Sequence, residues 1–439
     1  MAHIQEPAGR VGWSVERSRA VCGPRTRPDL SRRSLLTATG AAGATFLFSS
    51  ALGVPAYAAK GRRRVYVLVV DGCKPGEITS ELTPRLASLR HAGRNYPRAR
   101  SMPVMETIPN HVMMMTGVRP DRSGVPANSI FDRGTGEVRD MDRPTDLVFP
   151  TVIERLNRAG FTTGTVLSKE YLYGVFGDRA THRWEPSPVI PVSGHAPDVF
   201  TMDAALAMVE ELDPNLVFVN LGDVDRMGHS DFTGPNLQLA RQLALAETDL
   251  QVGRFVDMLK TSGRWRHSAV IVLADHSMDW SLPHQIVNLH SAFEAVPTLA
   301  GKVQIADNGG ADLLYWTGPR SGRAAAVQKM REVALATAGV LSVHSPASQR
   351  LSSLAGDLVV YCRAGWRFSD PEYVDNPIPG NHGHPATEPI PFFIGGGSDR
   401  VPRRTSSSRL ARTLDVAPTV GALFGLGAPR GGYDGRTLL

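Results

Sequence analysis

The sequence has little cysteine, and its glycines and prolines follow no period. Three cysteines among 439 residues exclude a disulfide-stapled scaffold and a zinc site built from thiolates. The 43 glycines and 32 prolines show no repeat that would indicate a fibre. We expect Cys73 and Cys362 to be free, buried thiols, and a pair formed outside the cell is the alternative.

An excess of charge of one sign is also missing from most of the chain. The formal charge is +6, and residues 1–59 hold seven arginines and three acids, which leaves a net +2 for the rest. That balance gives no support for a nucleic-acid-binding surface. The hydrophobic fraction of 42% excludes a disordered chain, and 439 residues allow one large domain or two of medium size.

A hydrophobic run that could span a membrane occurs once, near the N-terminus. Arg32 and Arg33 precede a mild run of small and apolar residues that reaches Val54, and 56–58 is an A-x-A cleavage motif. Residues 1–58 therefore resemble a twin-arginine (Tat) signal peptide, which the Tat export machinery would read. We expect the protein to be exported to the periplasm, the cell wall or the medium. An uncleaved N-terminal anchor is the alternative, because about 20 such residues can cross a bilayer.

Short runs that are apolar at every position indicate strands buried on both faces, as in a parallel sheet. Such runs lie at 65–70, 216–221 and 269–274, with a further strand at 163–167. Helical patterns alternate with them at 82–91, 110–117, 151–159 and 235–260. The sequence therefore predicts an α/β fold with a doubly wound, mostly parallel sheet and helices on both faces.

The stretch 300–370 has a different pattern. Short strands are predicted at 303–306, 312–316, 340–343 and 358–362, with one helix from about Arg323 to Ala338. We expect a small α+β lobe inserted in a main domain that runs from 62 to 439.

Three of the predicted strands end in carboxylates. Asp71, the pair Asp223 and Asp225, and Asp275 follow the three buried runs. In an open α/β sheet, ligands collect at the carboxyl ends of the strands. Carboxylates from three strand ends at one edge would repel one another unless cations held them together.

Histidines accompany these carboxylates at His229, His276 and the pair His382 and His384. Carboxylate and imidazole ligands without thiolate suit zinc or manganese. Each pair alone would be an ordinary loop turn with a solvated histidine. Their repetition at successive strand ends favours a metal site.

Thr107 is the candidate nucleophile. Pro109 suits the first turn of a helix, which would place Thr107 just before a helix N-terminus, where free N–H groups bind anions. A metal at that position would lower the pKa of the hydroxyl. The alternative is that Thr107 is a plain helix cap.

The chain carries a series of short motifs in a fixed order: Asp71-Gly72, Thr107-Ile-Pro-Asn-His111, Met115–Pro120, Gly124–Asn128, Asp225-x-x-Gly-His229, Asp275-His276, His382-Gly383, Leu414–Thr419 and Asp434-Gly435-Arg436. In this order they resemble the alkaline phosphatase superfamily, and most of all the type I phosphodiesterase/nucleotide pyrophosphatase family. The resemblance runs from about 65 to 439 and implies an alkaline phosphatase-like fold.

The resemblance also implies a site with two divalent metal ions, zinc in the first place with manganese or iron as alternatives. One metal would be held by Asp225, His229 and His382, with His384 as the rival of His382. The other would be held by Asp71, Asp275, His276 and Thr107, which would be ligand and nucleophile at once. Asn128 and the Thr107 backbone N–H would hold a phosphoryl oxygen.

The implied activity is hydrolysis of phosphodiester or pyrophosphate bonds through a phosphothreonine, on a phosphorylated small molecule, lipid or polymer. Ile108 stands where nucleotide pyrophosphatases carry an aromatic residue, which leaves a nucleotide preference open. No arginine can be assigned beside Thr107, so we expect diesters, which carry less charge, to be preferred over monoesters.

Two other activities and one non-enzyme function remain open. Ser168–Leu172 resembles the segment by which phosphonoacetate hydrolases present lysine to substrate, so Lys169 is a candidate substrate contact. A solvated Lys169 is the alternative. A phosphonoacetate hydrolase-like enzyme, a phosphomonoesterase, and a degenerate relative that only binds metal or a phosphorylated polymer are the competing functions.

Overall fold

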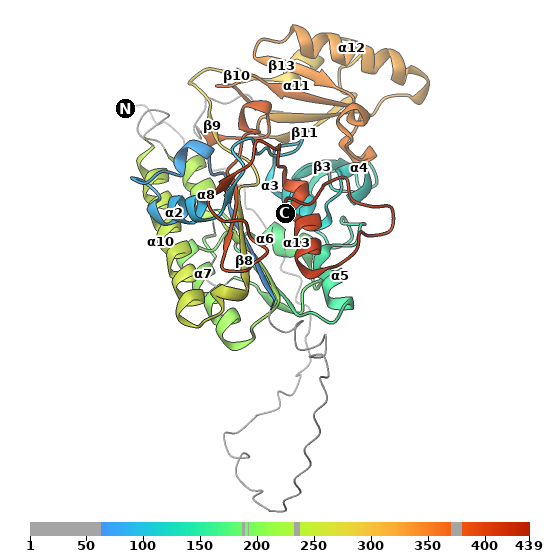
Figure 1. Ribbon diagram of the computed structural model, residues 1–439. Coiled ribbons are helices and arrows are strands. Elements are labelled where there is room, and N and C mark those ends of the chain that lie inside the picture. The colour runs from blue at the N-terminus through green and yellow to red at the C-terminus, as the bar shows by residue number, and fades with distance from the viewer. Residues whose placement is uncertain (1–62, 187–188, 192, 232–237, 370–379) are drawn as a thin grey trace, which may run out of the picture. The chain divides into compact units, whose positions relative to one another are not determined.

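The computed structural model describes residues 63–439 except 187–188, 192, 232–237 and 370–379 (Figure 1). Every described residue belongs to the second of the chain's two units, Val54–Leu439. The predicted signal peptide (1–58) and the predicted start of the long helix at 235 lie outside the described residues. Within them, no helix combines the length and the apolar character that crossing a membrane requires.

A sheet of eight strands forms the centre of the second unit. Its middle strand β1 (Arg64–Val70) pairs in parallel with β7 (Leu216–Leu221) and with β8 (Ser268–Leu273). Every residue of β7 and β8 is buried, as continuous apolar runs predict. Towards one edge follow β5 (Thr163–Leu167) and β6 (His182–Trp184), and towards the other β17 (Phe392–Gly396), β2 (Arg94–Asn95) and β18 (Thr405–Ser406). Only β17 runs antiparallel to its neighbours, so the prediction of a mostly parallel sheet is confirmed.

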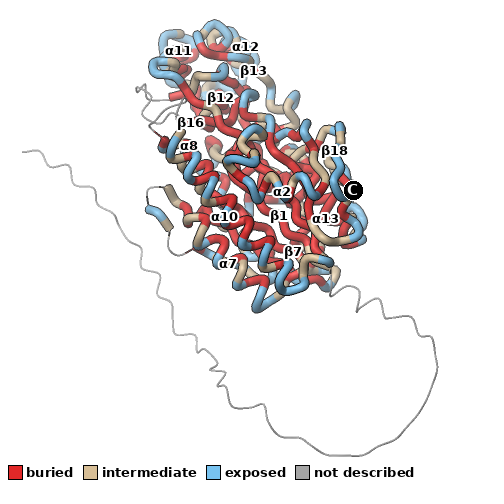
Figure 2. Tube along the Cα trace, turned by 60° about the vertical axis from the view of Figure 1, so that its left-hand side comes forward, coloured by how far each residue is buried: buried red, intermediate tan, exposed pale blue. Residues whose placement is uncertain are grey.

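Helices lie on both faces of this sheet (Figure 1). One group comprises α2 (Pro84–Ala92), α7 (Asp198–Glu211), α8 (Asp223–Ser230) and α10 (Leu239–Thr261). The other comprises α3 (Thr107–Thr116), α5 (Val152–Arg158), α6 (Glu170–Phe176) and α13 (Val416–Phe424). Figure 2 shows β1 buried between helices whose outward faces are exposed. The fold class predicted from the sequence is therefore correct.

The stretch 300–370 forms a second, antiparallel sheet in the order β11, β12, β14, β13. These strands are β11 (Val303–Asn308), β12 (Ala311–Trp316), β13 (Val340–His344) and β14 (Leu358–Cys362), and α12 (Arg323–Ala336) is the helix within the stretch. A further helix, α11 (Leu289–Glu294), precedes the stretch and packs against α12 and β11. The apolar side chains of this lobe form a hydrophobic cluster of their own. Asn308 joins the lobe to β3 (Ser129–Asp132), because its amide contacts both backbone groups of Ser129.

The remaining short elements are α4 (Pro120–Ser123), β4 (Glu137–Asp140), β9 (Asp279–Trp280), β10 (Ile286–Val287), β15 (Arg367–Phe368) and β16 (Gly380–Asn381). Cys73 and Cys362 are both buried and free, as predicted. One helix begins earlier than expected. Because α3 starts at Thr107 and its cap is Glu106, Thr107 is the first helical residue and is not the cap.

Candidate active site

The carboxyl ends of three adjacent strands bring the predicted metal ligands together. Asp71 follows β1, Asp275 and His276 follow β8, and Asp225 lies in α8 directly after β7. The turn after β1 needs glycine, because Gly72 has a φ of +71° and a Cβ there would lie 3.1 Å from the Asp225 backbone. This close approach brings Asp225 to the end of β1, next to Asp71.

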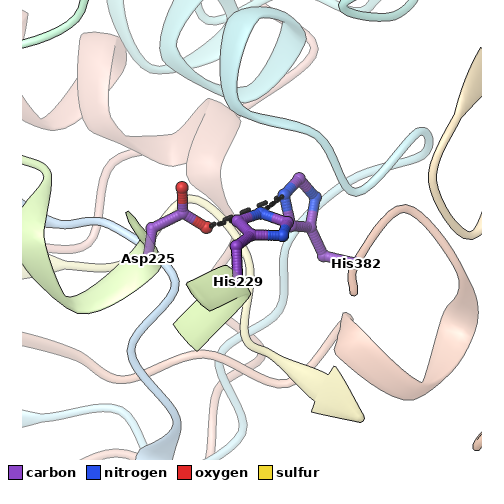
Figure 3. Close-up of side chains that lie close together, drawn as sticks. All are labelled: Asp225, His229 and His382. Carbon is purple, nitrogen blue, oxygen red and sulfur yellow. Dashed lines mark hydrogen bonds and ion pairs between the residues drawn. The ribbon is translucent and has the colours of Figure 1, made fainter. Parts of the chain in front are cut away.

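Asp225, His229 and His382 form the first group that could hold a metal ion, with ligand atoms all within 4.8 Å of one another (Figure 3). Asp225 and His229 are four residues apart on α8 and therefore share a face of the helix. The two histidine Nε2 atoms lie 3.0 Å apart, and the Gly380 carbonyl, 2.9 Å from His229 Nδ1, fixes that ring. The structure thus brings together the three residues that the sequence assigns to one metal.

The second predicted group also converges, around Thr107. Its Oγ1 lies 3.2 Å from His276 Nε2, which in turn is 3.4 Å from Asp275 Oδ2 and 3.7 Å from Asp71 Oδ1. Burial and the neighbouring His382 ring hold the pKa of His276 well below its usual value, so the imidazole is neutral and can act as a ligand. His111 from α3 could also take part, because it forms a possible metal group with Asp71 and Asp275.

The donor atoms of these groups fit a divalent cation. Asp71 Oδ1, Asp225 Oδ1 and Asp275 Oδ2 are buried, and none has a hydrogen-bond partner among the described residues. Buried carboxylate oxygens normally have partners, and oxygen together with imidazole nitrogen is a donor set for zinc or manganese. The residues present therefore suit two metal ions.

Lys169 lies among these carboxylates and is fully buried. Its Nζ is 2.7 Å from Asp225 Oδ2 and 2.9 Å from Asp71 Oδ2, so the alternative of a solvated lysine is wrong. Although burial opposes ionisation, Lys169 and His229 hold the pKa of Asp225 well below its usual value. Burial and repulsion from Asp275 raise the pKa of Asp71. The lysine thus offsets part of the negative charge that the site concentrates.

Glu106 is a residue that the sequence analysis missed. It is buried, caps α3 and places Oε1 3.0 Å from His382 Nδ1. Although burial lowers the pKa of His382, the Glu106 carboxylate raises it to about 9. The other carboxylate oxygen of Glu106, Oε2, accepts a hydrogen bond of 2.5 Å from Asn128 Nδ2. Glu106 therefore orients two residues of the predicted site, and its position directly before Thr107 is the one sequence signal that pointed to it.

Asn128 and His384 occupy different surroundings. Asn128 Oδ1 accepts a hydrogen bond of 2.8 Å from the Ile108 N–H, which ties it to the first turn of α3. His384 is buried with Nε2 2.9 Å from Asp279 Oδ2, and it belongs to none of the possible metal groups in the described chain. This arrangement agrees with the choice of His382 over His384.

A pocket of about 290 Å³ opens onto these groups. Its lining includes Thr107, Asn128, Tyr171, Arg226, His229 and His382. Arg226 is the second residue that the sequence analysis missed, since no arginine had been assigned to the neighbourhood of Thr107. The position of Arg226 beside Asp225 in the motif was visible, but nothing in the pattern showed that its side chain faces the pocket.

Comparison with known proteins places this geometry in a family. A model of the type I phosphodiesterase/nucleotide pyrophosphatase family matches residues 65–385. The chain belongs to this family. It is 26% identical over 244 residues to an uncharacterized pyrophosphatase/phosphodiesterase of Schizosaccharomyces pombe, covering 52% of this chain and 47% of the relative. It is 22% identical to the bis(5'-adenosyl)-triphosphatase of Bos taurus, covering 53% and 51%. The chain spans about half the length of these relatives.

Solved structures share the fold of this family member. Murine ectonucleotide pyrophosphatase/phosphodiesterase 5 superimposes with a TM-score of 0.69 at 17% identity, covering 85% of this chain and 97% of the murine chain. The phosphonoacetate hydrolase of Sinorhizobium meliloti superimposes with a TM-score of 0.64 at 17% identity, covering 83% and 95%. The alkaline phosphatase-like fold implied by the sequence motifs is thereby confirmed.

Proposed function

We propose that this protein is a metal-dependent hydrolase that cleaves phosphodiester or pyrophosphate bonds with Thr107 as the nucleophile. The observation that carries the proposal is the position of the Thr107 hydroxyl. It lies at the N-terminus of α3, 3.2 Å from His276 Nε2, in a pocket that the first metal group also lines. An inactive threonine-to-alanine variant of the murine protein, solved in complex with AMP, supports a threonine in this role.

Each side chain then has a defined task. Asp225, His229 and His382 would hold one metal, and Asp71, Asp275, His276 and Thr107 the other, with zinc proposed first and manganese or iron as alternatives. When bound, such a pair of cations stabilises charge on the attacking and leaving oxygens and lowers the pKa of the Thr107 hydroxyl.

The Thr107 hydroxyl gives up its proton to solvent and its oxygen attacks phosphorus. The bond to the leaving oxygen breaks, that oxygen takes up a proton from solvent, and a phosphothreonine remains on the chain. The Thr107 backbone N–H at the start of α3, with Asn128 beside it, would hold a non-bridging oxygen during transfer. Water then cleaves the phosphothreonine and regenerates the hydroxyl, so no co-reactant other than water is needed.

A substrate panel tests the proposal. Zinc-loaded protein is expected to show a higher kcat/KM on the diester bis(p-nitrophenyl) phosphate than on the monoester p-nitrophenyl phosphate, and ATP and phosphonoacetate complete the panel. A monoester preference would contradict the diester assignment. Zinc binding without turnover of any of these compounds would favour a degenerate relative.

Phosphonoacetate hydrolysis is the second candidate function, supported by the likeness of Ser168–Leu172 to a phosphonoacetate hydrolase segment and by the fold shared with such an enzyme. Lys169 itself does not line the pocket and forms ion pairs with Asp71 and Asp225, so the direct substrate contact expected from the sequence is not seen. If phosphonoacetate is the best substrate and Lys169→Ala abolishes its cleavage, this candidate replaces the first. The ion pairs of Lys169 with Asp71 and Asp225 mean that metal content must be measured in that variant.

We also propose that residues 1–58 direct export through the Tat machinery. The basis is the Arg32-Arg33 pair before a mild hydrophobic run and an A-x-A motif. Replacing both arginines with lysine is expected to trap the precursor in the cytoplasm, as measured by cell fractionation. Normal export of the double-lysine form would rule out this type of signal.

A further inference from the structure

One arginine lines the active-site pocket. Of the described lining residues, Arg226 is the only arginine or lysine. It follows Asp225 in α8, and its Nη2 donates a hydrogen bond of 3.3 Å to the Tyr171 hydroxyl. Its Cζ also lies 5.8 Å from the centre of the Tyr171 ring, a distance at which the ring attracts a cation. The guanidinium is thus held in place by an aromatic residue from α6.

Most of the hydrogen-bonding capacity of Arg226 is unused. Its Nε is buried and has no hydrogen-bond partner in the part of the chain that the structure describes. No described carboxylate lies within ion-pair distance of the guanidinium, which has five N–H donors and no acceptor. The two Nη atoms make one hydrogen bond between them in the described chain, the one to Tyr171. A guanidinium suits carboxylate and phosphate oxygens, so an anionic ligand in the pocket would supply partners for the remaining Nη donors.

Among the charged side chains in and around the pocket, Arg226 is the one available to bind an anion. Lys169 is engaged with Asp71 and Asp225 and does not line the pocket. Four carboxylates do line it, Glu106, Asp140 from β4, Asp225 and Asp307 from β11, and those that hold no metal would repel an anion. If a ligand carries a second anionic group besides its phosphoryl group, that second group therefore binds most favourably at Arg226.

We propose that Arg226, held by Tyr171, binds a second anionic group of the substrate, a carboxylate or a phosphate that is not itself cleaved. The inference rests on the proposed function, because it takes the scissile phosphoryl group to lie at Thr107. It narrows the substrate class to phosphoryl compounds that carry a further anion.

The role of Arg226 is tested by measuring ligand affinities on zinc-loaded Thr107→Ala protein, in which turnover is suppressed. Isothermal titration calorimetry compares phosphonoacetate with its neutral primary amide, and propane-1,3-diyl bisphosphate with propyl phosphate. We expect the compound with the second anion to bind at least tenfold more tightly in at least one pair. Adding Arg226→Gln should bring that ratio close to one. The pair that responds identifies the group as carboxylate or phosphate.

Two controls accompany this variant. Arg226→Lys, which keeps the charge but not the fork of donors, should retain part of the preference. Arg254→Gln, at an exposed arginine of α10, should leave the preference unchanged. An undiminished preference in Arg226→Gln would overturn the inference, as would an equal loss of affinity for both members of a pair. Turnover of bis(p-nitrophenyl) phosphate by the wild type, a compound without a second anion, tests the proposed function separately.

Discussion

Thr107→Ala is expected to lower kcat by roughly 10³-fold or more, the range typical of removing a nucleophile. The hydroxyl lies at the start of α3 and 3.2 Å from His276 Nε2, so its removal takes away the attacking atom while the neighbouring ligands stay in place. Fold and zinc content should therefore remain close to those of the wild type. Steady-state kinetics on bis(p-nitrophenyl) phosphate, with metal analysis of the same sample, measures both.

Two variants separate the loss of the nucleophile from damage to the helix. Thr107→Ser keeps a hydroxyl at the same position and should retain substantial activity. Thr116→Ala removes a buried hydroxyl at the other end of α3, one that donates to the Val112 carbonyl and accepts from the Val118 N–H, and should change kcat little. If Thr107→Ala turned over within tenfold of the wild type, water would be attacking phosphorus directly and the phosphothreonine mechanism would be wrong.

The sequence predicted the scaffold because its signals are local. A run such as 216–221 is apolar at every position, and a strand buried on both faces requires that, so strand β7 was placed with its correct bounds. Strand ends that carry Asp71, Asp225 and Asp275 meet at one edge for the same topological reason. The start of α3 was displaced by three residues because the sequence alone did not show that Glu106, and not a residue nearer Pro109, caps it.

The surroundings of the ligands could not be predicted, because contacts distant in sequence determine them. Glu106 reaches His382 across 276 positions, and Lys169 reaches Asp71 across 98. Neither the burial of Lys169 nor the orientation of Arg226 into the pocket leaves a periodic pattern in the chain. The charge argument for diesters was built without Arg226, so the substrate panel decides that preference.

His382→Ala is expected to halve the zinc stoichiometry, whereas His384→Ala should leave it unchanged. His382 Nε2 lies 3.0 Å from His229 Nε2 and 3.7 Å from Asp225 Oδ1, within one group of donors. His384, two residues on, instead holds Asp279 and lies in no such group among the described residues. Activity of His382→Ala should fall by roughly 10²-fold or more, because a catalytic metal contributes several kcal/mol and each 1.36 kcal/mol is tenfold in rate.

The two variants are matched controls for each other, since both remove a buried imidazole that contacts a carboxylate. His382→Ala also leaves the buried Glu106 without the imidazole N–H that it contacts, so some loss of stability is expected in that variant. His382→Gln, with an amide in place of the ring, checks that metal loss does not merely follow unfolding, and a thermal melt of each protein records its stability. The two histidines are only two residues apart, so either could be the ligand on sequence grounds. If zinc were lost only from His384→Ala, the ligand would be His384. Glu106 would then orient a histidine, His382, that binds no metal.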